Sequence, residues 1–179
     1  MTAWREKKQW VPLDLTGRLV SWPGSRRPDL YIAVAGQFDV EANPRYRREE
    51  DGRTWCNIYV WDVTRALQAE VPHWVGPDMR PASMGAVGAT EQTANEMVEW
   101  LRAGRGGWRS LRSREEAFET AQTGRPVVVG WRSPLGQIGH VAMVLPWSRI
   151  AQAGRTNLFS EPLERGFGAL KELEFFGHD

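Results

Sequence analysis

Apolar positions in the first two thirds of the chain follow a helical spacing. Between residues 54 and 67 they recur at intervals of three and four, which predicts a helix. Thr54 is placed to be its N-cap, and Pro72 closes the element. In residues 29–38 the apolar positions fit the spacing of a helix and also that of a strand, and we favour a helix there.

Two further helices begin at predicted capping boxes, in which a hydroxyl and a carboxylate satisfy each other's backbone donors. The segments Thr93–Glu96 and Ser113–Glu116 have the required spacing. Gly104 and Gly124 stand where each helix should end, because glycine readily adopts the left-handed conformation after a last helical turn. Both helices therefore have defined ends in the sequence.

After these helices, the spacing of the apolar residues changes from a helical period to that of β-strands. Residues 126–131 and 140–145 are rich in valine and predict a β-hairpin, and residues 150–153 supply a third strand. Helices followed by an antiparallel sheet indicate an α+β fold, with N-terminal helices packed on a small antiparallel sheet. Residues 1–28, rich in Pro, Gly, Arg and Trp, predict an irregular arm, and residues 29–179 a single domain.

Composition narrows the possible functions. The chain of 179 residues has 23 Lys and Arg against 22 Asp and Glu, and this balance argues against nucleic acid as a ligand. The single Cys excludes an internal disulfide, and with three scattered His it offers no metal-ligand spacing, so we expect no cofactor. No leader-like or membrane-spanning apolar run is present, which predicts synthesis in the cytoplasm without a signal peptide and no membrane insertion.

Cys56 and His140 are the candidate catalytic pair. Cys56 falls in the first turn of its predicted helix, where free N–H groups and the helix dipole favour a thiolate. His140 opens a predicted strand, from which its ring could act as general base and acid. Each alone is also typical of a structural residue, Cys56 as a small buried side chain and His140 as a hydrogen-bonded one. His73 and His178 are interpreted as structural or solvent-exposed.

The two motifs together resemble the NlpC/P60 and CHAP group of papain-like cysteine peptidoglycan hydrolases. The segments are Thr54-Trp-Cys-Asn-Ile-Tyr-Val-Trp-Asp-Val63 and Gly139-His-Val-Ala-Met-Val144, with family-like surroundings at 43–46 and 150–154. Members place the nucleophilic Cys at a helix start and the base His at a strand start. The resemblance covers roughly residues 43–168 and implies a papain-like fold for the domain.

Several positions depart from the family pattern. The family usually has Asp-Cys-Ser where this chain has Trp55-Cys56-Asn57. The residue that orients the His would be an amide here, with Gln152 preferred and Asn157 the alternative; Gln152 could also be an ordinary polar strand residue facing water. The Cys56 N–H would hold the oxyanion, with a second donor from one of two candidate side chains, Tyr46 or Asn57.

The resemblance implies hydrolysis of peptide-stem or sugar–peptide amides of peptidoglycan by a monomeric enzyme. Without a leader, such an enzyme would act on the wall after release, as an endolysin does, or after injection as a toxin with an immunity protein as partner. Trp55 and Trp131 are candidate substrate contacts or pocket walls. Exposed loop Trp rings at 74, 108, 131 and 147 could stack on sugar, although half-buried lids are the commoner outcome. The arginines at 45, 47, 48 and 53 form a solvated loop or attract stem carboxylates.

Two other functions remain compatible with the sequence. In the first, the protein is a non-catalytic wall-binding or partner-binding module and Cys56 is a packing residue. In the second, the same chemistry acts on a substrate outside the wall, in a papain-like peptidase or transferase. Reactivity of the thiol separates the first from an enzyme, because an activated thiolate is alkylated quickly near neutral pH and a buried thiol is not.

Overall fold

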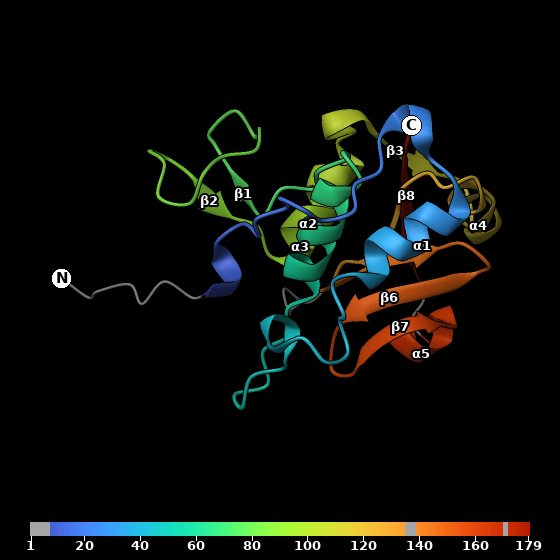
Figure 1. Ribbon diagram of the computed structural model, residues 1–179. Coiled ribbons are helices and arrows are strands. Elements are labelled where there is room, and N and C mark those ends of the chain that lie inside the picture. The colour runs from blue at the N-terminus through green and yellow to red at the C-terminus, as the bar shows by residue number, and fades with distance from the viewer. Residues whose placement is uncertain (1–7, 135–138, 170–171) are drawn as a thin grey trace.

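A six-stranded antiparallel sheet and five α-helices form the protein, as seen in a computed structural model that describes residues 8–134, 139–169 and 172–179 (Figure 1). The sheet has the strand order β3-β8-β4-β5-β6-β7, and a separate two-stranded sheet pairs β1 with β2. The helices are α1 Pro28–Gly36, α2 Cys56–Ala66, α3 Ala94–Arg102, α4 Arg114–Gln122 and α5 Leu163–Phe167. The strands are β1 Trp74–Val75, β2 Thr90–Glu91, β3 Trp108–Leu111, β4 Val127–Trp131, β5 His140–Leu145, β6 Arg149–Ala153, β7 Asn157–Glu161 and β8 Glu174–His178.

The core lies on both faces of the sheet. Val98 of α3 lies so close to Gly130 that a side chain there would collide with it, and Thr120 of α4 lies within ordinary contact distance of a Cβ at Gly177. Gly130 pairs with Glu174 across the β4–β8 ladder, and Gly177 is three residues farther along β8. Side chains alternate between faces along a strand, so α3 and α4 cover opposite faces. The valines of β4 and most of β5 are consequently buried from both sides.

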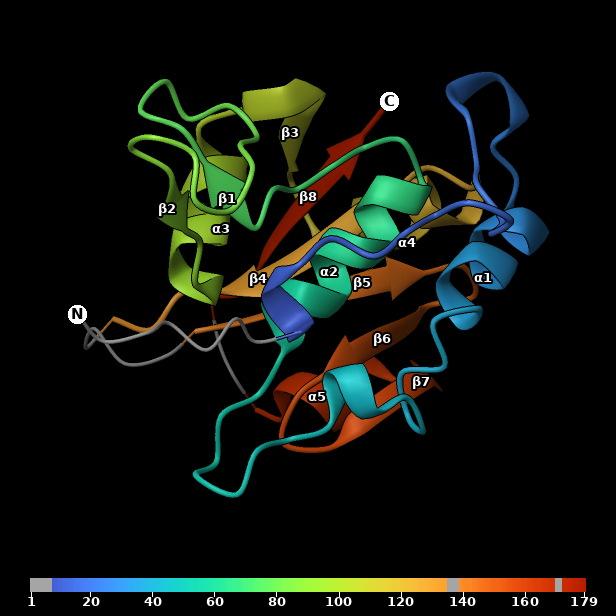
Figure 2. The same cartoon turned by 60° about the vertical axis from the view of Figure 1, so that its left-hand side comes forward.

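Helix α2 is buried almost all round, although its sequence carries Asp62, Thr64 and Arg65. One side packs on β5 and β6, and the N-terminal arm covers another side (Figure 2). The arm is tied along the helix by hydrogen bonds from Arg45 to the Val11 carbonyl, from Arg65 to Leu13, and from the Ser21 N–H to Ala66. The arm thus supplies the second wall that lets a partly polar helix lie at the centre of the molecule.

Most predicted elements are confirmed, with two corrections at helix starts. Helix α2 begins one residue later than expected: Trp55, not Thr54, is the N-cap, and it makes no side-chain capping bond, so Cys56 is the first helical residue. The α3 capping box at Thr93 is present. In α4, Ser113 accepts from the Glu116 N–H as expected, but the Glu116 carboxylate accepts from the Arg112 N–H instead of returning to Ser113.

The hairpin of β4 and β5 and the third strand β6 are confirmed, with Val127 opposite Val144 and Met143 opposite Ala151. The pattern did not predict β3, β7, β8 or the short helix α5. The two outer pairs, β3 with β8 and β6 with β7, complete the α+β fold. Among the residues described here, no helix has the length and apolar character needed to cross a bilayer.

Candidate functional site

Cys56 stands at the point where a loop enters the central helix. It is the first residue of α2, so its N–H belongs to the first turn, whose amides have no partner within the helix. The side chain is only 3% exposed. The first-turn amides and the dipole give the sulfur an electropositive setting despite that burial.

His140 and Gln152 bring the other half of the site from the sheet. His140 is the first residue of β5, and Gln152 lies on the neighbouring strand β6. The ring Nε2 of His140 and the Gln152 Oε1 are 2.6 Å apart. Because an amide oxygen can only accept, Nε2 carries the proton, and Nδ1 is the ring nitrogen left for the Cys56 sulfur, with which the ring also forms a hydrogen bond.

The orientation of the Gln152 amide is fixed from several directions. Its Nε2 donates to the Thr156 carbonyl at 3.1 Å, which turns Oε1 toward His140. Gly154 and Gly166 pack on the amide so tightly that a Cβ at either position would press on it. Phe167 lies against the His140 ring with the centroids 4.9 Å apart. The imidazole is therefore held in one tautomer and one plane.

The charges of the pair reinforce each other. Burial raises the pKa of the Cys56 thiol, but the positive charge of His140, its hydrogen bond, and the backbone N–H groups of Val141 and Asn57 lower that pKa overall. For His140, burial lowers the pKa, and the negative charge and hydrogen bond of Cys56, with the bond to Gln152, raise it overall. Both shifts favour a thiolate–imidazolium pair.

Tyr46 and Asn157 lie outside this arrangement. Tyr46 is fully buried, and its hydroxyl donates to Asp62 at 2.8 Å, so it is not presented to Cys56 as an oxyanion donor. Asn157 donates through its amide to the carbonyls of Val40 and Tyr46. Of the two amides considered for orienting His140, the structure brings Gln152 to the ring and uses Asn157 to join two loops.

Asn57, Trp55 and Trp131 surround the pair in different ways. The Asn57 amide donates to the Gln92 carbonyl at 2.9 Å and so faces the segment before α3, while its backbone N–H points to the sulfur. Trp55 is 5% exposed and belongs to the core. Trp131 lies directly across the β4–β5 ladder from His140 and is partly exposed, which places it beside the reactive groups.

The remaining candidate aromatic and imidazole side chains are not gathered at the pair. Trp108 is buried, and Trp147, which is 57% exposed, follows the end of β5 opposite to His140. His73 is buried, and this burial, with the charge of Arg45, lowers its pKa to about 3, so it stays neutral. His178 is half-buried beside Trp108. The interpretation of both histidines as structural or exposed agrees with these positions.

Sequence reasoning missed the parts that hold Gln152. The packing of β6, β7 and α5 brings four groups to the Gln152 and His140 side chains: Gly154, Gly166, Phe167 and the Thr156 carbonyl. The sequence pattern predicted neither β7 nor α5. In the sequence, the one signal of this packing was Gly154, which comes directly after the third predicted strand. A glycine inside or next to a strand often marks close approach of another group.

Within the described ranges, no three His, Cys, Asp or Glu side chains are grouped as a metal site would require. No protein-family model matches the sequence, and no curated protein matches it significantly.

Proposed function

We propose that the protein is a papain-like cysteine hydrolase that cleaves amide bonds of peptidoglycan, related to the NlpC/P60 and CHAP group. The observation that carries this proposal is the hydrogen-bonded series Cys56–His140–Gln152, assembled from a helix start and two adjacent strands. A nucleophile, a base and a group orienting the base are the parts that acyl transfer through a thioester needs.

The reaction starts from the thiolate–imidazolium pair. The Cys56 sulfur attacks the amide carbonyl carbon, and the tetrahedral intermediate collapses as the C–N bond breaks and His140 gives its Nδ1 proton to the leaving amine. A water molecule then enters, His140 removes one of its protons, and the hydroxide attacks the thioester. The C–S bond breaks, the acid product leaves, and the proton on His140 restores the ion pair.

The start of α2 supplies the oxyanion site in this proposal. The Cys56 N–H belongs to the free first turn, next to the attacking sulfur. The Asn57 side chain, engaged with Gln92, contributes by fixing the helix start and not as the second donor. Gln152 holds the ring in the tautomer that presents Nδ1 to sulfur, which is the role of the amide in papain-like enzymes.

Peptidoglycan is proposed as substrate on the resemblance of the two motifs, with the α+β order of helices and sheet in agreement. The wall would be reached by release through a pore or by injection into another cell. In the second case an immunity protein that covers the site would protect the producer. Trp131, beside His140 at the end of β4, is the aromatic side chain best placed to contact substrate.

One observation favours a different function, a non-catalytic binding module in which Cys56 is packing: the side chain is 3% exposed and lies in the hydrophobic core cluster. A packing thiol, however, needs neither an imidazole hydrogen-bonded to its sulfur nor an amide that fixes the ring, whereas a nucleophile needs both. We therefore favour the enzyme, and the third possibility, a non-wall substrate, is decided by the same assay.

The test is mass spectrometry of muropeptides before and after treatment of purified peptidoglycan. The wild-type protein should release new amine ends, whereas Cys56→Ala and His140→Ala should release none. Both variants should unfold at the same denaturant concentration as the wild-type protein. His178→Ala, which removes the other partly exposed imidazole, is the matched control and should stay active. Unchanged muropeptides with the folded wild-type protein would overturn the wall substrate, and activity retained in Cys56→Ala would overturn the nucleophile.

A further inference from the structure

The arginines that precede Cys56 separate into two groups. The Arg45 side chain is only 9% exposed and pairs with Asp62 at 2.7 Å, and Arg53 pairs with the nearby Asp51 at 2.6 Å. Arg47 and Arg48 are exposed instead. Both line a pocket of about 390 Å³ to which Arg155 contributes from the turn between β6 and β7.

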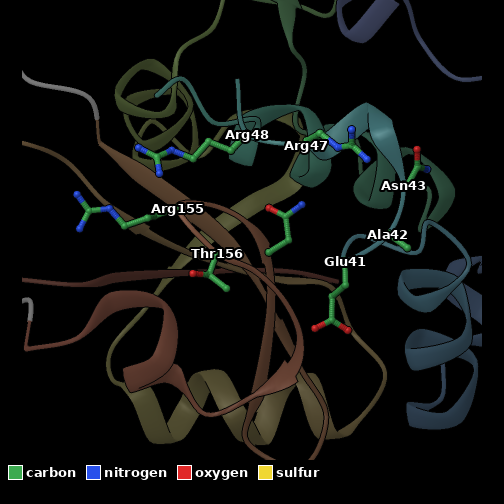
Figure 3. Close-up of a pocket in the computed structure, with 8 residues that line it drawn as sticks. Glu41, Ala42, Asn43, Arg47, Arg48, Arg155 and Thr156 are labelled. Carbon is green, nitrogen blue, oxygen red and sulfur yellow. The ribbon is translucent and has the colours of Figure 1, made fainter. Parts of the chain in front are cut away.

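The lining of this pocket has more positive than negative side chains, and the acidic Glu49, Glu50 and Asp51 line the adjoining hollow that Arg47 and Arg48 also border. Within the described part of the chain, the guanidinium groups of Arg47 and Arg155 make no hydrogen bond or ion pair, and Arg48 only reaches the Gly52 carbonyl at 3.4 Å. Glu41 is the one acidic side chain in the lining. Figure 3 shows Arg48 and Arg155 extending toward the same side of the pocket, whereas the Arg47 side chain points to the opposite side and Glu41 points away from Arg48 and Arg155. Two converging arginines, with one carboxylate in the lining, favour an anion between them.

The pocket has a built floor. The side chain of Asn157 donates to Val40 at 2.8 Å and to Tyr46 at 3.0 Å, and so fastens the turn after β6 to the loop that bears Arg47 and Arg48. Because Asn157 itself lines the pocket, the two arginine-bearing segments are held together by a partly buried hydrogen-bonded group. Their approach is therefore a property of the fold and not of the side chains alone.

This pocket lies beside Gln152, the residue that orients the ring of the reactive pair. Arg155 follows Gly154, where a Cβ would stand 3.2 Å from the His140 ring, and the carbonyl of Thr156 holds the Gln152 amide. The pocket is thus two hydrogen bonds from His140, through Thr156 and Gln152. A peptide advances at most about 3.6 Å per residue, so a group one to three residues from the scissile amide falls within about 11 Å of it.

We infer that Arg48 and Arg155 form, in this pocket, a subsite for a free carboxylate of the substrate, and that the enzyme prefers peptide stems whose carboxylates are not amidated. The inference rests on the proposed function. Guanidinium and carboxylate form paired, charge-assisted hydrogen bonds that an uncharged carboxamide cannot reproduce. The pocket would therefore select substrate by charge close to the bond that is cut.

The test measures binding and cleavage separately. Calorimetry with the Cys56→Ala protein uses a muropeptide with free stem carboxylates and the same muropeptide after chemical amidation. We expect the acid form to bind more tightly, Arg48→Gln and Arg155→Gln each to weaken it about three- to tenfold, and the amidated form to be insensitive to both. Added salt should reduce the difference between acid and amide forms. Arg27→Gln, which removes an exposed arginine paired with Asp29 at the start of α1, is the matched control.

Equal affinity for the acid and amide forms, or losses no larger than in Arg27→Gln, would overturn the subsite. In the active protein the two arginine variants should raise KM and leave kcat unchanged for the acid substrate. Cleavage without arginine dependence would remove the subsite and leave the hydrolase. Arginine-dependent binding without any cleavage of muropeptides by the wild-type protein would remove the hydrolase and leave the carboxylate site.

Discussion

Replacing Gly154 with Ala tests whether the packing around Gln152 positions the reactive pair. Gly154 has an ordinary φ, so alanine is compatible with its backbone. Its new Cβ, however, would stand 2.8 Å from the Gln152 Nε2 and 3.2 Å from the His140 Cε1. Ordinary contacts begin near 3.4 Å, so the amide has to move by about 0.6 Å or the strand has to yield.

That displacement has two measurable consequences. Overpacking of a close-packed site costs about 1–3 kcal/mol of unfolding free energy. A domain of this size has about 5–15 kcal/mol, so nearly all molecules stay folded. Activity should fall further, by about 10- to 100-fold in kcat, because shifts of the order of 1 Å in a catalytic group cost about that much. The loss in rate would then exceed anything that unfolding explains.

The assay pairs urea unfolding with initial rates of muropeptide release. Gly24→Ala is the control, because a Cβ at Gly24 meets nothing within 4 Å and its φ is also ordinary. The control should leave both quantities unchanged. Wild-type kcat in Gly154→Ala, or a fall in rate that matches the unfolded fraction, would refute the positioning of His140 through Gln152.

Three further outcomes follow from the same contacts. Gln152→Ala should lower kcat about tenfold, which is less than the loss in His140→Ala. It should also shift the alkaline limb of the pH–rate profile to lower pH, because the bond to Gln152 raises the pKa of His140. An alkaline limb at unchanged pH would contradict that bond. Asp62→Asn should lower the unfolding free energy by about 3–5 kcal/mol in urea, because the largely buried Arg45 side chain loses its carboxylate. Asp51→Asn, at an exposed pair, should cost less than about 1 kcal/mol, and equal costs would count against the Arg45–Asp62 contact. Asn57→Ala should cost about 1–3 kcal/mol in the same assay, because the buried Gln92 carbonyl loses its donor; a cost within error of zero would show that this bond is not needed.

The sequence indicated those parts of the fold whose signal is local. The helix containing Cys56, the capping box at Thr93 and the valine-rich strands β4 and β5 each carry their pattern within a few residues. The strands β3, β7 and β8 lack one. Two adjacent residues of β3, Arg109 and Ser110, are both exposed, and three adjacent residues of β8, 175–177, are all buried, so exposed and buried positions do not alternate along these two strands. Their pairing is decided by contacts far along the chain.

The residues of the candidate site also fall into two groups: those that a local sequence feature indicates and those whose role depends on contacts far along the chain. Cys56 and His140 were found because a helix start and a strand start are local features that alter reactivity. Tyr46 was misjudged because nothing nearby in the sequence shows that its hydroxyl meets Asp62, a buried carboxylate on the central helix. The choice between Gln152 and Asn157 likewise needed the register of β6 and β7, which places Gln152 opposite Leu158 and Asn157 at the turn.

Alkylation of Cys56 by iodoacetamide as a function of pH tests the reactive pair most directly. With the pKa of the thiol lowered by His140, the wild-type rate should rise with pH along a limb centred below the value of about 8.5 of a free cysteine. In His140→Ala that limb should move to higher pH, because burial then raises the pKa unopposed by the imidazolium. A thiol that is not alkylated in the folded wild-type protein, or a limb unchanged in His140→Ala, would contradict the thiolate–imidazolium pair.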